Sequence, residues 1–130
     1  MKKRMKIFKV RIFTEEYSIV VYIGTKKQII SAAARFLNCS YKAVENDFGN
    51  CRGRAWNALD DVYGNKMPLM IVDGDMPVAQ AMATVAHEAS HCMDFIERYI
   101  GLNDVNGEFH AHGISAVMRA VGKVYLQEKK

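Results

Sequence analysis

Apolar and polar residues alternate with a period of two near the start of the chain. Over residues 6–12, every second position is apolar and the positions between them carry most of the charge, as in a strand with one buried face. Residues 17–23 are apolar at nearly every position, which is typical of a more deeply buried strand. The polar residues 14–16 between the two runs predict a turn, so the simplest interpretation is a β-hairpin.

Two helical stretches follow this hairpin. Residues 26–38 place apolar side chains at helical spacing, with Thr25 as a suitable N-cap and Asn38 near the end, which predicts an amphipathic helix packed on the hairpin. Residues 41–47 predict a short second helix. Residues 48–54 contain two glycines and predict a loop.

A short apolar run predicts a further strand. It follows Pro68, which suits the edge of a sheet because proline has no N–H to donate to a neighbouring strand. Its residues are Leu69, Met70, Ile71 and Val72. Strands in the first half and long helices in the second predict the α+β class, and the length fits a single domain over residues 1–130.

Two long helices complete the pattern. Asp75 can cap the first of them, with Pro77 in its first turn, and the apolar stripe continues to about Ile100 before Gly101 ends it. A last helix is predicted over residues 106–127, with its apolar positions directed at the sheet or at the preceding helix. The two helices are therefore expected to pack against each other and against one face of the sheet.

Charge and composition narrow the class of protein. Half of the residues are hydrophobic, enough for a proper core, and no run of about 18 apolar residues predicts a membrane span. The net charge is +4, and much of it comes from the first eleven residues, which either bind nucleic acid or an acidic partner or form a solvated basic end. These residues lack the apolar core of a signal peptide, so we expect the protein to stay in the cytoplasm.

Cysteine usage argues against two classes of small protein. The three cysteines are widely spaced and form no Cys-x-x-Cys pair, so neither a disulfide framework nor a cysteine zinc ribbon is predicted. Cys92 is expected to be a small buried residue. One further set combines basic and aromatic groups, and it suits nucleic-acid binding, a pocket lining, or one core tryptophan beside exposed arginines: Arg52, Arg54, Trp56 and Tyr63.

The first long helix contains the sequence His-Glu-x-x-His at residues 87–91. On a helix, His87 and His91 are one turn apart and project from the same face, so their imidazoles can hold one Zn²⁺ ion. Glu88 lies beside them and can accept a proton from a water on that ion. The surrounding positions are small, which leaves room for metal, water and substrate: Ala83, Ala86, Ala89 and Ser90. The motif predicts a zinc-dependent hydrolase with Glu88 as the general base.

A catalytic zinc usually has three protein ligands, so a third must come from elsewhere in the fold. Glu108 is the first choice, because it would lie in the first turn of the last helix, and the short connection keeps that helix near the motif. The same carboxylate could instead complement the helix dipole. His112, one turn further on the same face, is the alternative ligand or a group that orients one. Asp94, one turn after His91, could orient a histidine or be an exposed carboxylate.

Hydrolysis of a carbonyl also needs a donor that stabilises the developing oxyanion. The sequence offers several donors and does not choose among them: His110, His112, Tyr99, Tyr63 and Arg52. As a metal ligand, His110 is the weaker candidate, because it points to nearly the other side of the last helix from Glu108.

These residues carry a resemblance to a known family. The sequence His-Glu-Ala-Ser-His at residues 87–91, followed by Gly-Glu-Phe-His-Ala-His at residues 107–112, resembles the zincin metallopeptidases, and a glutamate third ligand places it nearest to the gluzincin branch. Residues 84–94, with the later glutamate and its helix, are similar to minimal HExxH proteins of bacteriophages and prophages. The chain departs from the gluzincin pattern at Gly107 and His112, where that pattern usually has Asn and Asp.

The resemblance implies a minimal zincin-like fold, in which a small antiparallel or mixed sheet packs on the motif helix and the C-terminal helix. In that fold an edge strand pairs with an extended peptide substrate, and residues 69–72 would be that strand. The implied function is a zinc metallopeptidase acting on a peptide or protein, in the host cytoplasm if the chain is phage-encoded. The alternative is a non-catalytic, zinc-stabilised phage protein that binds and inhibits a host or defence protein.

Overall fold

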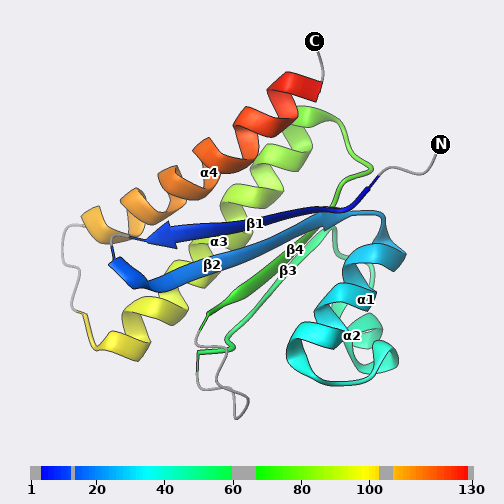
Figure 1. Ribbon diagram of the computed structural model, residues 1–130, viewed down its shortest axis with the longest axis horizontal. Helices are drawn as coiled ribbons and strands as arrows, with labels where there is room; N and C mark the ends of the chain where they lie inside the picture. Colours follow the sequence, from blue (N-terminus) through cyan, green and yellow to red (C-terminus); the bar gives the residue numbers. More distant parts are fainter. Residues whose placement is uncertain (1–3, 13, 60–66, 103–106, 129–130) are drawn as a thin grey trace.

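The computed structural model describes residues 4–12, 14–59, 67–102 and 107–128, and these residues form one sheet with helices on both sides (Figure 1). The strands are β1 (Lys6–Ile12), β2 (Thr14–Gly24), β3 (Gly53–Trp56) and β4 (Leu69–Asp73). The helices are α1 (Lys26–Leu37), α2 (Tyr41–Phe48), α3 (Val78–Ile100) and α4 (Glu108–Glu128).

The sheet is mixed and has the strand order β1-β2-β4-β3. β1 and β2 form the predicted antiparallel hairpin, β2 runs parallel to β4, and β3 runs antiparallel to β4. The parallel pair is possible because α1, α2 and β3 separate β2 from β4 in the sequence and supply the long crossover that parallel strands need. The α+β class predicted from the apolar pattern is confirmed.

The period-two pattern of β1 matches its burial. Val10 and Ile12 are buried, whereas Lys9 and Arg11 on the other side of the strand are exposed. The turn predicted at residues 14–16 is wrong, because β2 already begins at Thr14. The register shifts between Arg11 and Ile12 so that Ile12 pairs with Thr14, and this pairing leaves those polar residues inside the strand.

Helices cover both faces of the sheet (Figure 1). The helices α3 and α4 lie side by side on one face, and α1 and α2 pack on the other, as was expected for the amphipathic helix after the hairpin. The strand β4 belongs to both cores, since Met70 and Val72 pack with α3 and α4 while Leu69 and Ile71 pack with α1. All of its residues are therefore buried.

The position of β4 corrects the predicted edge strand. Residues 69–72 lie between β2 and β3, so they are not at the edge of the sheet. Pro68 precedes the strand, and its carbonyl accepts a hydrogen bond from the Val20 N–H at 3.0 Å, so the missing N–H of proline does not interrupt the pairing. An unbroken apolar run is typical of a strand covered on both faces, and here that signal outweighs the proline.

The edge position beside β4 belongs to β3, whose first two residues lie at the end of the stretch predicted as a loop. Its alternate residues face opposite sides of the sheet: Gly53 and Ala55 face α3, and Trp56 packs with the core around α1 and α2. The Trp56 indole also donates a hydrogen bond to the Asp47 carboxylate at 3.2 Å. Glycine usually indicates a loop, which is why the strand was not predicted. Gly53 is instead required for close packing of β3 against α3.

Local capping chemistry explains the ends of α1 and α2. Thr25 caps α1 as predicted, in a reciprocal arrangement with the Gln28 side chain. Asn38 ends the helix in the left-handed conformation with φ 54°. The short helix α2 confirms the prediction for residues 41–47, and the Ser40 hydroxyl caps it.

The beginning of α3 differs from the prediction. Asp75 does not cap this helix; the N-cap is Pro77, and the helix starts at Val78. The backbone N–H of Asp75 donates instead to the Asp73 carboxylate at 2.9 Å, so Asp75 belongs to the turn that leaves β4. Gly101 ends the helix as predicted, with φ 69°.

The helices α3 and α4 pack closely where α4 has a glycine. A Cβ atom at Gly113 would overlap the Sδ, Cε and Cγ atoms of Met93, which is fully buried. Any larger residue here would force the Met93 side chain or the helix to shift. The helix α4 begins at Glu108 after Gly107, which has φ 70°. The start predicted at residue 106 lies outside the described residues.

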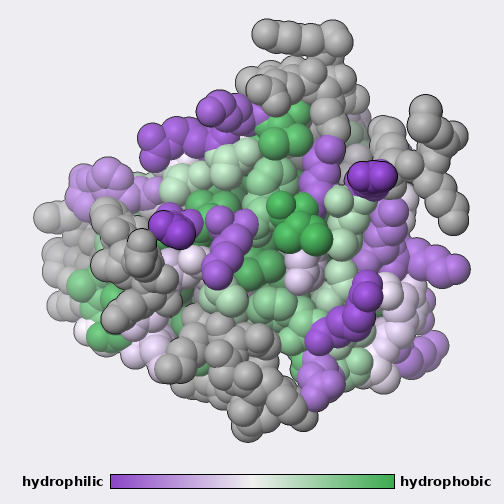
Figure 2. All heavy atoms as spheres, viewed as in Figure 1, coloured by the Kyte–Doolittle hydropathy of each residue, from purple (hydrophilic) through white to green (hydrophobic). Residues whose placement is uncertain are grey.

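Surface character follows from this arrangement. Figure 2 shows apolar atoms in the middle of the viewed face with hydrophilic side chains among them and around them. Among the described residues, no helix has both the length and the apolar composition required to cross a bilayer.

The basic N-terminus is described only from Arg4 onward.

Candidate metal centre

The two motif histidines converge on one point of the α3 surface. The Nε2 atoms of His87 and His91 are 3.2 Å apart, and the rings meet edge to face with centroids 4.8 Å apart. Two nitrogens bound to one tetrahedral Zn²⁺ at about 2.0–2.1 Å would be separated by roughly 3.3 Å, so the pair has the spacing that one ion requires. Both residues are exposed, so an ion held by them would be accessible from solvent.

Glu88 lies between this pair and the sheet. Its residue is only 7% exposed. Burial raises the pKa of its carboxyl above the ordinary value of 4.5, and the charges of His87, His91 and Arg54 offset part of that rise. A carboxylate whose pKa is raised binds a proton more readily, which is what a general base near neutral pH requires.

Gly53 of β3 is the contact that encloses Glu88. A Cβ atom at Gly53 would lie 2.7 Å from Thr84 Cγ2 and only 3.0 Å and 3.2 Å from Cγ and Oε2 of Glu88. The strand backbone therefore approaches α3 at the motif, and the absence of a side chain at this position leaves the space that the Glu88 carboxylate occupies.

The direction of the β3 backbone groups follows from its pairing. The Asp73 N–H donates to the Arg52 carbonyl at 2.8 Å, and Arg52 is directly opposite Asp73 in the register. Because hydrogen-bonded pairs alternate in an antiparallel ladder, Gly53 and Ala55 turn their N–H and C=O groups away from β4. The Arg52 guanidinium also binds the Asp73 carboxylate at 2.9 Å and so fixes the start of this edge.

The structure does not bring Glu108 or His112 to the histidine pair. Among the described residues, only one set of three or more His, Cys, Asp and Glu ligand atoms lies within 4.8 Å of one another, and it contains neither motif histidine. The reason is the rotation of α4. Its His110 faces α3, and residues two positions before or after it are rotated by about 200° away. Glu108 and His112 are both exposed.

The set of converging ligand atoms belongs to Asp94, Glu97 and His110. His110 Nδ1 is 2.8 Å from Glu97 Oε2 and 3.5 Å from Asp94 Oδ1. Its other ring nitrogen, Nε2, is 2.8 Å from Ser90 Oγ. His110 lies on nearly the opposite side of α4 from Glu108, as expected, but it is His110 that faces α3, where its ring contacts Ser90, Asp94 and Glu97.

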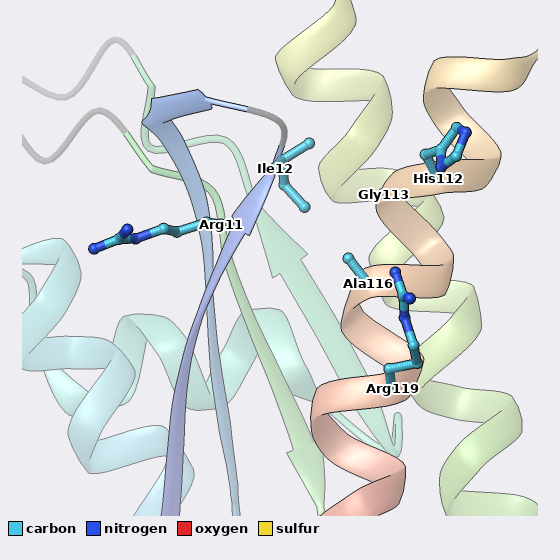
Figure 3. Close-up of a pocket in the computed structure, with 6 residues that line it drawn as sticks. All are labelled: Arg11, Ile12, His112, Gly113, Ala116 and Arg119. Atoms are coloured by element: carbon cyan, nitrogen blue, oxygen red, sulfur yellow. The ribbon is translucent and has the colours of Figure 1, made fainter.

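His112 lies instead beside a surface pocket between β1 and α4 (Figure 3). The pocket has a volume of about 180 Å³ and is also lined by Arg11, Ile12 and Arg119. Figure 3 shows that the Arg11 side chain is directed away from α4, so the two arginines do not converge on one point.

The remaining oxyanion candidates are dispersed. Tyr99 packs edge to face on Tyr17, with ring centroids 6.3 Å apart. Arg52 pairs with Asp73, and Tyr63 lies outside the described residues. Cys92 is fully buried, as predicted, and burial together with the nearby Glu88 raises the pKa of its thiol, so it stays protonated rather than becoming a metal ligand.

Two residues of this region were missed by sequence reasoning. Glu97 resembles any other charged residue late in a helix, and Gly53 resembles a loop glycine. The apolar stripe of α4 did contain a usable signal, because Gly113, Val117 and Val121 are buried and repeat in phase with His110. That phase indicates that His110, rather than Glu108, faces the motif helix.

Comparisons with protein-family models, with curated proteins and with solved structures find no match to this chain.

Proposed function

We propose that this chain is a zinc-dependent peptidase whose metal is held by His87 and His91 and whose general base is Glu88. The observation that carries the proposal is the 3.2 Å separation of the two Nε2 atoms directly beside a buried carboxylate. Neither feature alone is specific. Together they provide two nitrogen ligands and a base within one helical turn.

The chemistry divides between the metal and the chain. When bound, zinc would polarise the scissile carbonyl and acidify a water molecule. Glu88 accepts the proton of that water and delivers it to the leaving amine, and its raised pKa suits both transfers. Gly53 keeps the carboxylate in place, because the β3 backbone closes one side of its pocket. Glu108 stays the sequence-based prediction for a third ligand.

Substrate binding is assigned to β3 in place of β4. This strand ends the sheet, packs against Glu88 and turns the backbone groups of Gly53 and Ala55 outward. An extended peptide that pairs with those groups would bring its own backbone alongside the motif. We assign the activity to the cytoplasm, of a host cell if the chain is phage-encoded.

The test combines metal content with hydrolysis. Purified protein should contain zinc and cleave a fluorescence-quenched peptide library. His87→Ala should abolish hydrolysis and lower the zinc content by the one ion held at the motif, whereas Glu88→Gln should keep that ion and lower hydrolysis by about 100- to 10,000-fold. The matched control is Glu45→Gln, which alters a surface carboxylate on α2 that pairs with Lys42.

The outcomes separate the two functions considered from the sequence. Full hydrolysis in Glu88→Gln would refute the assigned base. Stable zinc binding without any hydrolysis in the parent protein would refute the peptidase and favour the non-catalytic, partner-binding alternative.

A further inference from the structure

We propose that Asp94, Glu97 and His110 form a second divalent-cation site, which joins the end of α3 to the beginning of α4. The site is separate from the histidine pair of the motif. Its occupant would be a transition-metal ion such as Zn²⁺ or Mn²⁺, and its role would be to fasten the two helices together.

The donor atoms are already gathered. One oxygen from each carboxylate and one ring nitrogen lie within 4.8 Å of one another. Asp94 and Glu97 are three residues apart on α3, so they project from neighbouring positions on one face, and His110 reaches them from the first turn of α4. Two helices therefore contribute to a single cluster, which a chance run of surface acids on one helix would not do.

The orientation of His110 suits a metal ligand. Its Nε2 lies 2.8 Å from Ser90 Oγ, while Nδ1 is directed at both carboxylates. With the proton on Nε2, that nitrogen donates to the serine hydroxyl and Nδ1 offers its lone pair to an ion. Metal-binding histidines usually hold their second nitrogen in a hydrogen bond of this kind, which fixes the ring and its tautomer.

Charge and burial indicate the class of ion. Two carboxyl groups and one imidazole form a donor set that suits a divalent cation. The nitrogen donor favours a transition metal over Mg²⁺ or Ca²⁺, which prefer oxygen ligands. The side chains of Glu97 and His110 are 13% and 23% exposed and that of Asp94 is 45% exposed, so the cluster is enclosed on one side and open to water on the other.

The two sites do not share ligands. The cluster of Asp94, Glu97 and His110 includes neither motif histidine. Asp94 lies about one helical turn after His91, and Glu97 lies nearly two turns after His91. Removal of the motif histidines should therefore leave the second site intact, and this independence makes the proposal testable apart from the proposed peptidase.

The experiment uses the full chain carrying His87→Ala and His91→Ala, so that the motif pair no longer binds metal. Equilibrium dialysis against Zn²⁺ or Mn²⁺, followed by metal analysis, should give one ion per chain, and the ion should raise the Tm. Adding Glu97→Gln, which keeps the shape of the side chain, should weaken binding by about 10-fold or more and remove the Tm shift. The control in the same background is Glu45→Gln, which should change neither.

Asp94→Asn provides a second variant, since its half-exposed side chain can lose its charge without disturbing the core. It should also weaken binding by about 10-fold or more, with the circular dichroism spectrum unchanged. The proposal is overturned if the double histidine variant binds no ion and its Tm does not respond to metal. It is equally overturned if Glu97→Gln and Asp94→Asn bind as tightly as their parent, because the cluster is then only a hydrogen-bonded histidine between two acids.

Discussion

The helix α3 carries two polar groups of similar composition in very different surroundings. The first, His87 with Glu88 and His91, is made by one helix and is approached by the backbone of β3. The second, Asp94 with Glu97, becomes a cluster only because His110 of α4 turns toward it. One group is therefore a property of local sequence, whereas the other is a property of helix packing.

This difference explains which parts could be recognised in advance. The geometry of an i, i+4 pair is set by the helix alone, so the spacing of His87 and His91 in the sequence was enough to predict that their side chains lie together. A ligand from another helix depends on how that helix is rotated about its axis. In this structure α4 approaches α3 closely at Gly113 against Met93, and the spacing of Gly113, Val117 and Val121 with His110 is the sequence signal for that rotation.

The largest expected effect concerns the ligands of the metal at the motif. His87→Ala should weaken zinc binding at the motif by about 100-fold or more, because a direct ligand matters more than an outer contact. Glu108→Ala should weaken it far less, since Glu108 is exposed and directed away from the face that His110 presents. Competition with a chromophoric chelator measures both. A similar loss in the two variants would show that α4 rearranges to place Glu108 on the metal.

The packing of α4 should matter for the second group and much less for the first. Gly113→Ala places a Cβ against Met93 and should lower the free energy of unfolding by about 1–3 kcal/mol. Urea denaturation measures the change. The environment of His110, followed by its imidazole NMR signals, should shift, while those of His87 and His91 stay nearly constant. Unchanged His110 signals would show that the position of His110 does not depend on the contact between Gly113 and Met93.

The approach of β3 should matter for the first group alone. Gly53→Ala should displace Glu88 and reduce peptide hydrolysis by about 10-fold with zinc still bound, because small misplacements of a reacting group are costly. Thr84→Ser removes the methyl group that the new Cβ would meet at 2.7 Å, so the double variant should recover part of the activity. No recovery would mean that the strand itself has moved.

The smallest effect concerns pH and the metal-free protein. Because the pKa of Glu88 is raised on folding, its protonated form favours the folded state, and that contribution is lost as pH rises from 4.5 through the raised pKa. Metal-free Glu88→Gln should therefore be more stable than the parent at neutral pH and equally stable below pH 4.5. The gain should be about 1 kcal/mol or less, because solvent around the exposed histidines screens the carboxylate. Thermal unfolding across this range would refute the raised pKa if the difference between the two proteins were constant.

Much of the fold could be predicted because its signals are local. The alternation in β1, the cap at Thr25 and the stop at Gly101 each depend on a few neighbouring residues. The strand β3 could not be predicted, because Gly53 signals a loop until α3 is placed against it. The position of β4 was misjudged because Pro68 suggested an edge, while the pairing partners on both sides come from distant segments.

The four residues of β3 would also determine which positions along a bound peptide can pair with the strand. The outward groups belong to Gly53 and Ala55, whose side chains are absent or a single methyl, so recognition there would involve the main chain of the peptide. Backbone pairing repeats every two residues. A peptide could therefore shift by two residues along β3 without losing its hydrogen bonds. Its cleavage products would then differ in length by two residues.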